Sequence, residues 1–268
     1  RKRAGKLANL EKALIESPLP PTSVGIGHTR WATHGAPNDV NAHPHLSEDG
    51  QLAVIHNGIT ENFAELREEL QSGGVTFLSE TDTEVAAHLL AVMLREEGNL
   101  TEAMQRTCQR LRGAFTLVAA SADDPDTLVG ARRNSPLVVG LGDGETFLAS
   151  DVSAFIAHTR NAMELGQDQV ITITREGVSV SDFEGVEAQG SEYEVTWDAS
   201  AAEKGGYDLF MLKEIAEQPK AVADTLLGRI TEDNRLMLEG LTISDVELRE
   251  IDKIVVAACG TAYHAGLV

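Results

Sequence analysis

The sequence changes in texture near Ala114, and this change constrains the fold more than any other feature. Before it, apolar residues recur at helical spacing, as in residues 62–71 and 85–97. After it come short runs rich in Val, Leu, Thr and Phe, most of them separated by Asp, Gly and Pro clusters, which is typical of strands. Helices and strands of this kind within 268 residues predict a layered α+β domain.

The pattern locates the individual elements. Helices are expected over 4–16, 62–71, 81 to about 97 and 100–111, and strands over 24–27, 51–56, 115–118, 127–129, 137–139, 146–148, 170–173 and 178–180. Thr81-Asp82-Thr83-Glu84 is a capping-box pattern at a helix start. The last two strands predict a hairpin across residues 175–177.

The chain divides into three parts by composition. Residues 1–198 hold the α+β pattern, residues 199–206 are expected to be a linker, and residues 207–268 begin a second domain. In that domain helices are expected over 209–217 and 221–227, with a break at Pro219, because proline cannot continue a helix. A buried-type strand over 253–258 is expected to lead into Cys259-Gly260-Thr261 and a helix, a common but unspecific phosphate cradle.

Composition excludes several classes of partner. The net charge of −20 argues against nucleic acid, whose phosphates need a positive protein face. We find no apolar run of membrane-spanning length and no secretory signal, so no membrane association is expected. Cys108 and Cys259 lie far apart in sequence, which fits two thiols in a reducing cytoplasm. The chain begins with Arg and stops inside an expected element, so we expect a fragment of a longer protein.

A dense polar block from Gly27 to Asn62 is the candidate site. Five of the eight histidines lie in it, although no helix or strand needs that mixture for packing. A zinc site is disfavoured, because the block has neither a His-x-x-x-His pair on a helix nor a Cys-x-x-Cys pair. We therefore predict no metal, and most of the histidines are interpreted as residues that shape loops.

Two charged residues suit the ends of an amino acid. The planar guanidinium of Arg30 matches a carboxylate, although a surface ion pair is the alternative. Asp82 begins a helix, where it can either anchor an ammonium group or simply interact with the helix dipole. Together, Arg30 and Asp82 would bind both charges of an α-amino acid.

Two further features have alternative interpretations. Asn57 and Gly58 offer a side-chain amide next to a backbone N–H, a plausible oxyanion hole. The alternative is a hairpin turn, for which Asn-Gly is a favoured pair. Trp31 could act as a lid over a site or as an anchor that packs its loop down.

The motifs resemble, in order, those of the glutamine–fructose-6-phosphate aminotransferase (isomerizing) family, also called glucosamine-6-phosphate synthase. The resemblance covers nearly the whole chain. It is carried by residues 28–35, 41–45, 56–58, 80–84, 135–137, 149–151, 213–215, 217–219 and 259–261.

The resemblance implies a fold and a reaction. The fold is an Ntn-hydrolase-type αββα sandwich of the class II glutamine amidotransferases, incomplete at its N-terminus here, followed by the start of an α/β sugar-isomerase (SIS) domain. The reaction transfers ammonia from L-glutamine to D-fructose 6-phosphate and yields glucosamine 6-phosphate and glutamate. The family implies no cofactor, a cytoplasmic location and a homodimer formed through the isomerase half.

The resemblance also implies residue roles. Arg30 corresponds to the glutamine carboxylate clamp, Asp82 to the ammonium anchor, and Asn57 with Gly58 to the oxyanion hole. Trp31, Thr33 and His34 correspond to the loop that closes over glutamine, and Cys259, Gly260 and Thr261 to the start of the sugar-phosphate site. The family often has Ser where this chain has Ala262, which removes one possible hydroxyl contact.

The largest departure from the family is the nucleophile, an N-terminal cysteine whose own amino group can act as the base. We expect this chain to begin after that residue and so to be inactive by itself. Two alternatives stay open at this point: another amidotransferase with the same glutaminase domain, and a non-catalytic module that binds glutamine.

Overall fold

The computed structural model describes residues 1–30, 32–196, 207–226 and 243–268. The chain divides into two compact units, 1–202 and 203–268, each considered by itself. The expected linker, 199–206, lies outside the described residues, as does Trp31.

Two antiparallel sheets form the centre of the first unit. The strands are β1 (His45–Leu46), β2 (Leu52–Thr60), β3 (Gly113–Ser121), β4 (Leu128–Arg133), β5 (Val138–Leu141), β6 (Thr146–Ala149), β7 (Asn161–Glu164), β8 (Gln169–Ile173), β9 (Val178–Asp182) and β10 (Ser191–Glu194). Six of them form one sheet in the order β1-β2-β3-β4-β8-β9, and four form the other in the order β10-β7-β5-β6. The predicted hairpin is confirmed as β8–β9, closed by a hydrogen bond from Thr174 N–H to the Gly177 carbonyl.

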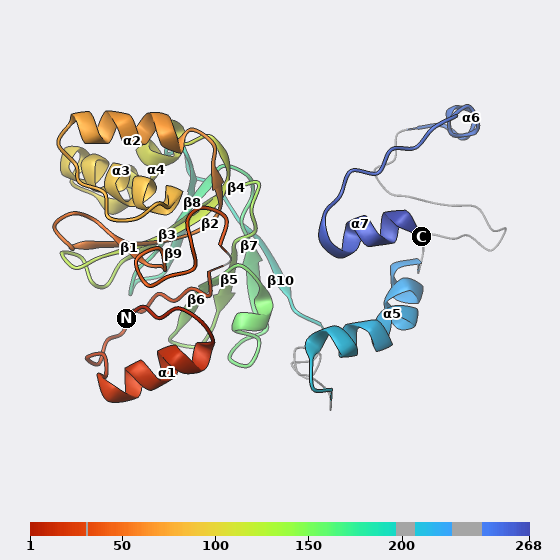
Figure 1. Ribbon diagram of the computed structural model, residues 1–268, viewed down its shortest axis with the longest axis horizontal. Helices are drawn as coiled ribbons and strands as arrows, with labels where there is room; N and C mark the ends of the chain where they lie inside the picture. The colour runs from red at the N-terminus through yellow and green to blue at the C-terminus, as the bar shows by residue number, and fades with distance from the viewer. Residues whose placement is uncertain (31, 197–206, 227–242) are drawn as a thin grey trace. The chain divides into compact units, whose positions relative to one another are not determined.

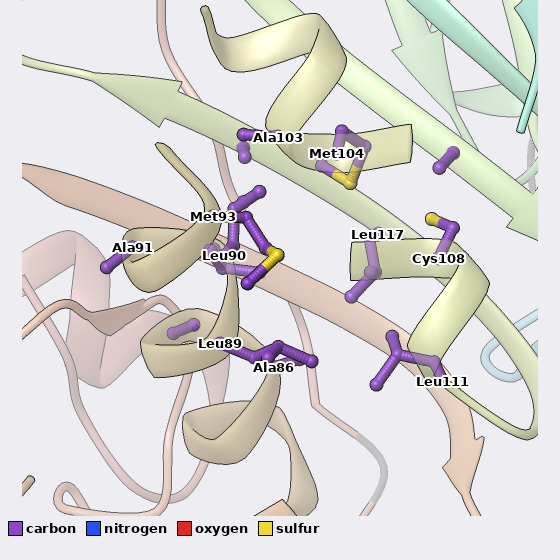
Figure 2. Packing of buried hydrophobic residues seen from close by; sticks show 14 of the residues in the cluster. Ala86, Leu89, Leu90, Ala91, Met93, Ala103, Met104, Cys108, Leu111 and Leu117 are labelled. Carbon is purple, nitrogen blue, oxygen red and sulfur yellow. The ribbon is translucent and has the colours of Figure 1, made fainter. Parts of the chain in front are cut away.

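Three helices form a layer on the six-stranded sheet: α2 (Phe63–Ser72), α3 (Asp82–Glu97) and α4 (Leu100–Arg110) (Figure 1). Their apolar side chains meet those of β2, β3 and β4 in the largest core cluster. Leu90 of α3, Met104 of α4 and Leu117 of β3 belong to this cluster (Figure 2). This packing fixes the N-terminus of α3 relative to β2.

A second core lies between the two sheets. Its buried members come from both sheets and from adjoining turns: Val118, Leu137, Val139, Met163, Leu165, Ile171, Ile173 and Val180. The layers are therefore helices, sheet and sheet. The remaining α-helix of residues 1–196, α1 (Leu7–Glu16), lies apart from α2–α4 and buries only Ala13 (Figure 1).

The structure corrects three expectations in the first unit. Residues 24–27 form no strand. The short or exposed strands β1, β7 and β10 have no strong apolar alternation and were not predicted. The alternative interpretation of Asn57-Gly58 as a hairpin turn is wrong, because β2 continues to Thr60 and pairs with β3 along its whole length.

The second unit contains three helices in its described part: α5 (Phe210–Leu226), α6 (Asp245–Arg249) and α7 (Gly260–Leu267). The break expected at Pro219 is wrong, since α5 runs through it. Proline there removes one helical hydrogen bond, and Ile215, four residues earlier, whose carbonyl loses that bond, is 53 % exposed. The strand expected over 253–258 is also wrong, because no strand in the described residues of this unit is available to pair with it.

No helix in the described parts of the chain is long and apolar enough to span a bilayer.

Candidate functional site

A cavity of about 270 Å³ lies where β2, the N-terminus of α3 and the polar block meet. This is just below the usual size of small-molecule pockets, about 300–1,000 Å³. Its lining residues are His28, Arg30, Thr33, His43, His56, Asn57, Gly58, Ile59, Thr81, Asp82 and Thr83. The structure thus brings together Arg30, Thr33, Asn57, Gly58 and Asp82, five of the seven residues predicted to handle glutamine.

Arg30 organises the loop that follows it. Its Nη1–H donates to the Ala36 carbonyl at 3.1 Å, and its Nη2 group donates to the carbonyls of His34 and Gly35. The buried Asn41 secures this loop, because its Nδ2 donates to the Ala36 carbonyl and to Glu80 Oε2, both at 3.0 Å. Arg30 itself lines the cavity.

Asp82 is the first residue of α3 and is only 3 % exposed. Its Oδ2 accepts a hydrogen bond from the Thr60 N–H at 3.0 Å, so β2 and α3 meet at this carboxylate. His34 Nδ1 lies 3.9 Å from Oδ1, and His56 Nδ1 lies 3.8 Å from Oδ2. A buried anion at a helix N-terminus, on a cavity wall, is well placed to pair with an ammonium group.

Asn57 and Gly58 lie side by side in β2. Gly58 has φ of +114°, and an added Cβ would lie 2.1 Å from the Ala114 carbonyl oxygen of β3. Glycine is therefore needed here both for its backbone conformation and for the close approach of β3. The distorted residue lies where β2 is paired with β3 on both sides of it, so Asn57 and Gly58 form part of the cavity wall and not a turn.

Three histidines, His28, His43 and His56, line the cavity, and His45 contacts Thr81 of its wall. Burial is the main cause that lowers the pKa of His43 to about 2 and that of His45 to about 4, and the nearby Arg30 acts in the same direction on both. Burial also lowers the pKa values of His28 and His56, against the opposing effects of Asn57 and Asp82 respectively.

Each neutral ring has a polar partner. The Thr83 hydroxyl lies 2.9 Å from His43 Nε2 and 3.0 Å from His56 Nδ1, and the Thr81 hydroxyl lies 3.0 Å from His45 Nε2. No group of His, Cys, Asp and Glu side chains in the described parts of the chain is arranged to hold a metal ion. The rings bind hydroxyls and amides instead of converging on one point.

Five residues that the sequence patterns had assigned to other roles also line the cavity. Thr81 and Thr83 were assigned only to the helix cap, and His28, His43 and His56 only to loop shaping. The alternation Thr-Asp-Thr in the capping pattern was the available signal, because both threonines flank the predicted ammonium anchor. Of the remaining predicted residues, His34 lies beside Asp82, whereas Trp31 is outside the described residues.

The two cysteines occupy very different environments. Cys108 is fully buried in the core between α3, α4 and β3, and burial raises the pKa of its thiol (Figure 2). A buried, protonated thiol is inert as a nucleophile. Cys259 is exposed and precedes α7, where Gly260 has φ of +61°. Gly260 and Thr261 begin that helix, and the role predicted for these three residues stays a prediction.

A family profile described as "Glutamine amidotransferase domain" matches residues 18–202. The chain belongs to the glutamine amidotransferase domain family. The matched residues contain the whole described cavity lining.

Curated relatives are similar over the full chain. A "glutamine–fructose-6-phosphate aminotransferase [isomerizing]" from Streptomyces coelicolor is 65% identical over 267 residues, covering 100% of this chain and 43% of the relative. One from Corynebacterium diphtheriae is 60% identical over 268 residues, covering 99% of this chain and 43% of the relative. The chain therefore spans less than half the length of these relatives.

A solved structure supports the fold. The "allosteric regulatory enzyme of purine biosynthesis" matches with a TM-score of 0.50 at 26% identity, covering 58% of this chain and 34% of that one. Together with the family match, this establishes the first unit as a class II glutamine amidotransferase domain of the Ntn type.

Proposed function

We propose that this chain is the glutamine-hydrolysing part of a glutamine–fructose-6-phosphate aminotransferase (isomerizing). The whole protein transfers ammonia from L-glutamine to D-fructose 6-phosphate and yields glucosamine 6-phosphate and glutamate. The observation that carries the proposal is the single cavity shared by Arg30, Asp82, Asn57 and Gly58. Identity of 65% to a relative of that name supports the choice of acceptor.

The cavity suggests how glutamine is held. Arg30 binds the α-carboxylate and Asp82 binds the α-ammonium group, so both charges of the amino acid are fixed. The side-chain amide then lies near Asn57 and Gly58. The Asn57 Nδ2–H and the Gly58 N–H stabilise the oxyanion that develops when a nucleophile adds to the amide carbon.

The nucleophile in this proposal is a cysteine thiolate outside these 268 residues. Cys108 is excluded by its burial, and Cys259 is not an N-terminal residue whose own amino group could act as the base. Attack releases ammonia and leaves a thioester, which water then hydrolyses to glutamate. Binding of glutamine, in contrast, needs only residues present in this chain.

Calorimetry of this chain with L-glutamine tests the binding step. Arg30→Lys and Asp82→Asn should each weaken affinity about 10- to 100-fold, because each removes a charged hydrogen bond of about 1.5–3 kcal/mol. Arg175→Lys is the matched control, since Arg175 forms an exposed ion pair with Asp126. If the unaltered chain does not bind glutamine, or if the control loses as much affinity, the proposed site is wrong.

The acceptor is tested on the whole protein. With glutamine and fructose 6-phosphate it should form an amino-sugar phosphate and glutamate in equal amounts. Amination of phosphoribosyl pyrophosphate or aspartate instead would assign the chain to a different amidotransferase. Glutamine binding without turnover in the whole protein would favour a non-catalytic binding module.

We also propose that residues 207–268 begin an isomerase domain of the SIS type. Cys259, Gly260 and Thr261, at the start of α7, then form the first part of the sugar-phosphate site. In the whole protein, Thr261→Val should raise the KM for fructose 6-phosphate and leave the KM for glutamine unchanged. We further propose a cytoplasmic homodimer, which size-exclusion chromatography and cell fractionation of the whole protein test directly.

A further inference from the structure

Asn57 needs an orienting partner if its amide is to serve the cavity. The terminal torsion of an Asn side chain is broad and nearly two-fold, so its oxygen and nitrogen ends exchange places easily. Only the NH₂ end can donate to an oxyanion. Asn57 is also exposed in β2, so packing alone does not select one orientation.

His28 supplies that partner. Its Nε2 lies 2.8 Å from Asn57 Oδ1. An amide oxygen only accepts, so Nε2 carries the proton and donates. This bond holds the oxygen of Asn57 on the imidazole and leaves both Nδ2 hydrogens available to the cavity.

The His28 ring is itself held in place. It stacks on His43 with ring centroids 4.1 Å apart and an angle of 32° between the rings. His43 is buried and bonded to Thr83 of α3. Burial lowers the pKa of His28, so the ring is neutral and has one N–H to donate. The orientation of Asn57 is therefore tied to α3, the helix that carries Asp82.

We propose that His28 is a positioning residue that orients the Asn57 amide for oxyanion stabilisation through its Nε2–H. This role rests on the proposed glutaminase function. It concerns the transition state, because the oxyanion develops only there, so it should affect kcat and leave the KM for glutamine nearly unchanged.

Two substitutions separate donation from packing. His28→Phe keeps an aromatic ring over His43 but removes the donor, whereas His28→Gln keeps an N–H that can reach Asn57. In the whole protein, His28→Phe should lower kcat for glutamate release at least about 10-fold. The upper bound is the 10²–10³-fold typical of losing an oxyanion donor. His28→Gln should restore much of that loss.

A double-mutant cycle tests the coupling. If His28 acts through Asn57, then His28→Phe combined with Asn57→Ala should be no slower than Asn57→Ala alone. His158→Phe is the control, since His158 is exposed and pairs with Glu145 away from the cavity. The proposal is overturned if the kcat reductions of the two single variants multiply in the double variant, or if His28→Phe leaves kcat unchanged. In both cases the unaltered protein still hydrolyses glutamine, so the proposed function is not affected.

A measurement independent of turnover completes the test. Nitrogen-15 NMR of the histidine rings should find His28 as the Nε2–H tautomer, and Asn57→Ala should shift that signal. The Nδ1–H tautomer would overturn the proposal even in an active enzyme. If the unaltered whole protein releases no glutamate from glutamine, the proposed function fails and this role fails with it.

Discussion

Because Gly58 has a hydrogen atom where other residues have a Cβ, β2 and β3 can approach each other closely at this position. The residue has φ of +114°, a conformation that L side chains rarely adopt, and its α-carbon faces the Ala114 carbonyl across the ladder. The amide of Asn57 and the N–H of Gly58 are thereby presented from a strand instead of from a mobile turn. Placing donors on a strand keeps their positions well defined.

Gly58→Ala should therefore destabilise the protein strongly. The strained backbone alone costs about 1–3 kcal/mol, and the contact with Ala114 adds to it. Gly144→Ala is the matched control, because Gly144 also has positive φ, +72°, but open space around it, so its cost should stay near 1 kcal/mol. Urea unfolding followed by circular dichroism measures both. Equal losses in the two variants would contradict a role for the contact.

At the scale of elements, the N-terminus of α3 links the cavity to the fold. The Thr81 hydroxyl caps the helix by accepting from the Glu84 N–H at 3.2 Å. The Glu84 carboxylate accepts from the N–H groups of Leu78 and Ser79, at 2.8 Å and 2.6 Å, instead of returning to Thr81. The N-terminal cap predicted at Thr81 is confirmed. The Glu84 side chain binds residues 78 and 79, which precede the helix, instead of Thr81.

The cap should matter for binding as well as for stability. Thr81→Ala should cost about 0.5–2 kcal/mol of stability, as should Asn99→Ala at the cap of α4. Only Thr81→Ala should also weaken glutamine binding, because α3 begins with Asp82. Thermal unfolding and calorimetry on both variants provide the comparison. Equal effects on binding would show that general destabilisation is the cause.

The buried His43 and His45, which contact Thr83 and Thr81 at the start of α3, predict that the protein loses stability in acid. The folded pKa of His45 is about 4, below the value of about 6.5 in an unfolded chain. The unfolded state therefore takes up a proton first, so stability is complete above about pH 6.5 and falls towards pH 4. His43, with a folded pKa of about 2, extends the loss to lower pH.

Urea unfolding at a series of pH values measures this slope. His45→Asn should flatten the fall between pH 6.5 and 4, because the variant has no group that titrates at this position. His158→Asn, at an exposed site, should leave the slope as it is. A protein with equal stability at pH 7 and pH 4.5 would refute the prediction.

Local sequence patterns predicted some features well and others poorly. Helical spacing located α2 and α4, since each buries one side, and the capping pattern located the start of α3, which is buried on all sides over its first ten residues. The chemistry of Arg30 and Asp82 suggested a shared ligand. Local preference left a turn at Asn57-Gly58 open as an alternative, whereas pairing of β2 with β3 overrides that preference. The contact of His28 with Asn57 joins residues 29 positions apart, which no local pattern reveals.

For the whole molecule, the two units differ in how much they bury. The core clusters use residues from 52 to 195, whereas apolar side chains of the second unit, such as Phe210, Ile254 and Val255, are exposed. The residues described as lining the cavity all belong to the first unit. Stability and glutamine binding should therefore reside in residues 1–202.

A chain ending at residue 202 tests this directly. Its urea midpoint and its affinity for glutamine should match those of the 268-residue chain. A control ending at residue 183, which removes β10, should be less stable, because β7 then loses one of its two antiparallel partners and becomes an edge strand. A large loss of affinity in the 202-residue chain would place part of the site in the second unit.

The cavity has one further property, which concerns folding order. Its described lining runs only from His28 to Thr83, so the site closes over a short stretch of chain. Loop-closure entropy grows slowly with length, and contacts between near neighbours in sequence form fast. The glutamine cavity can therefore form once β3 has paired with β2 and the first turn of α3 has met β2. Insertions between later strands should leave its assembly rate almost unchanged.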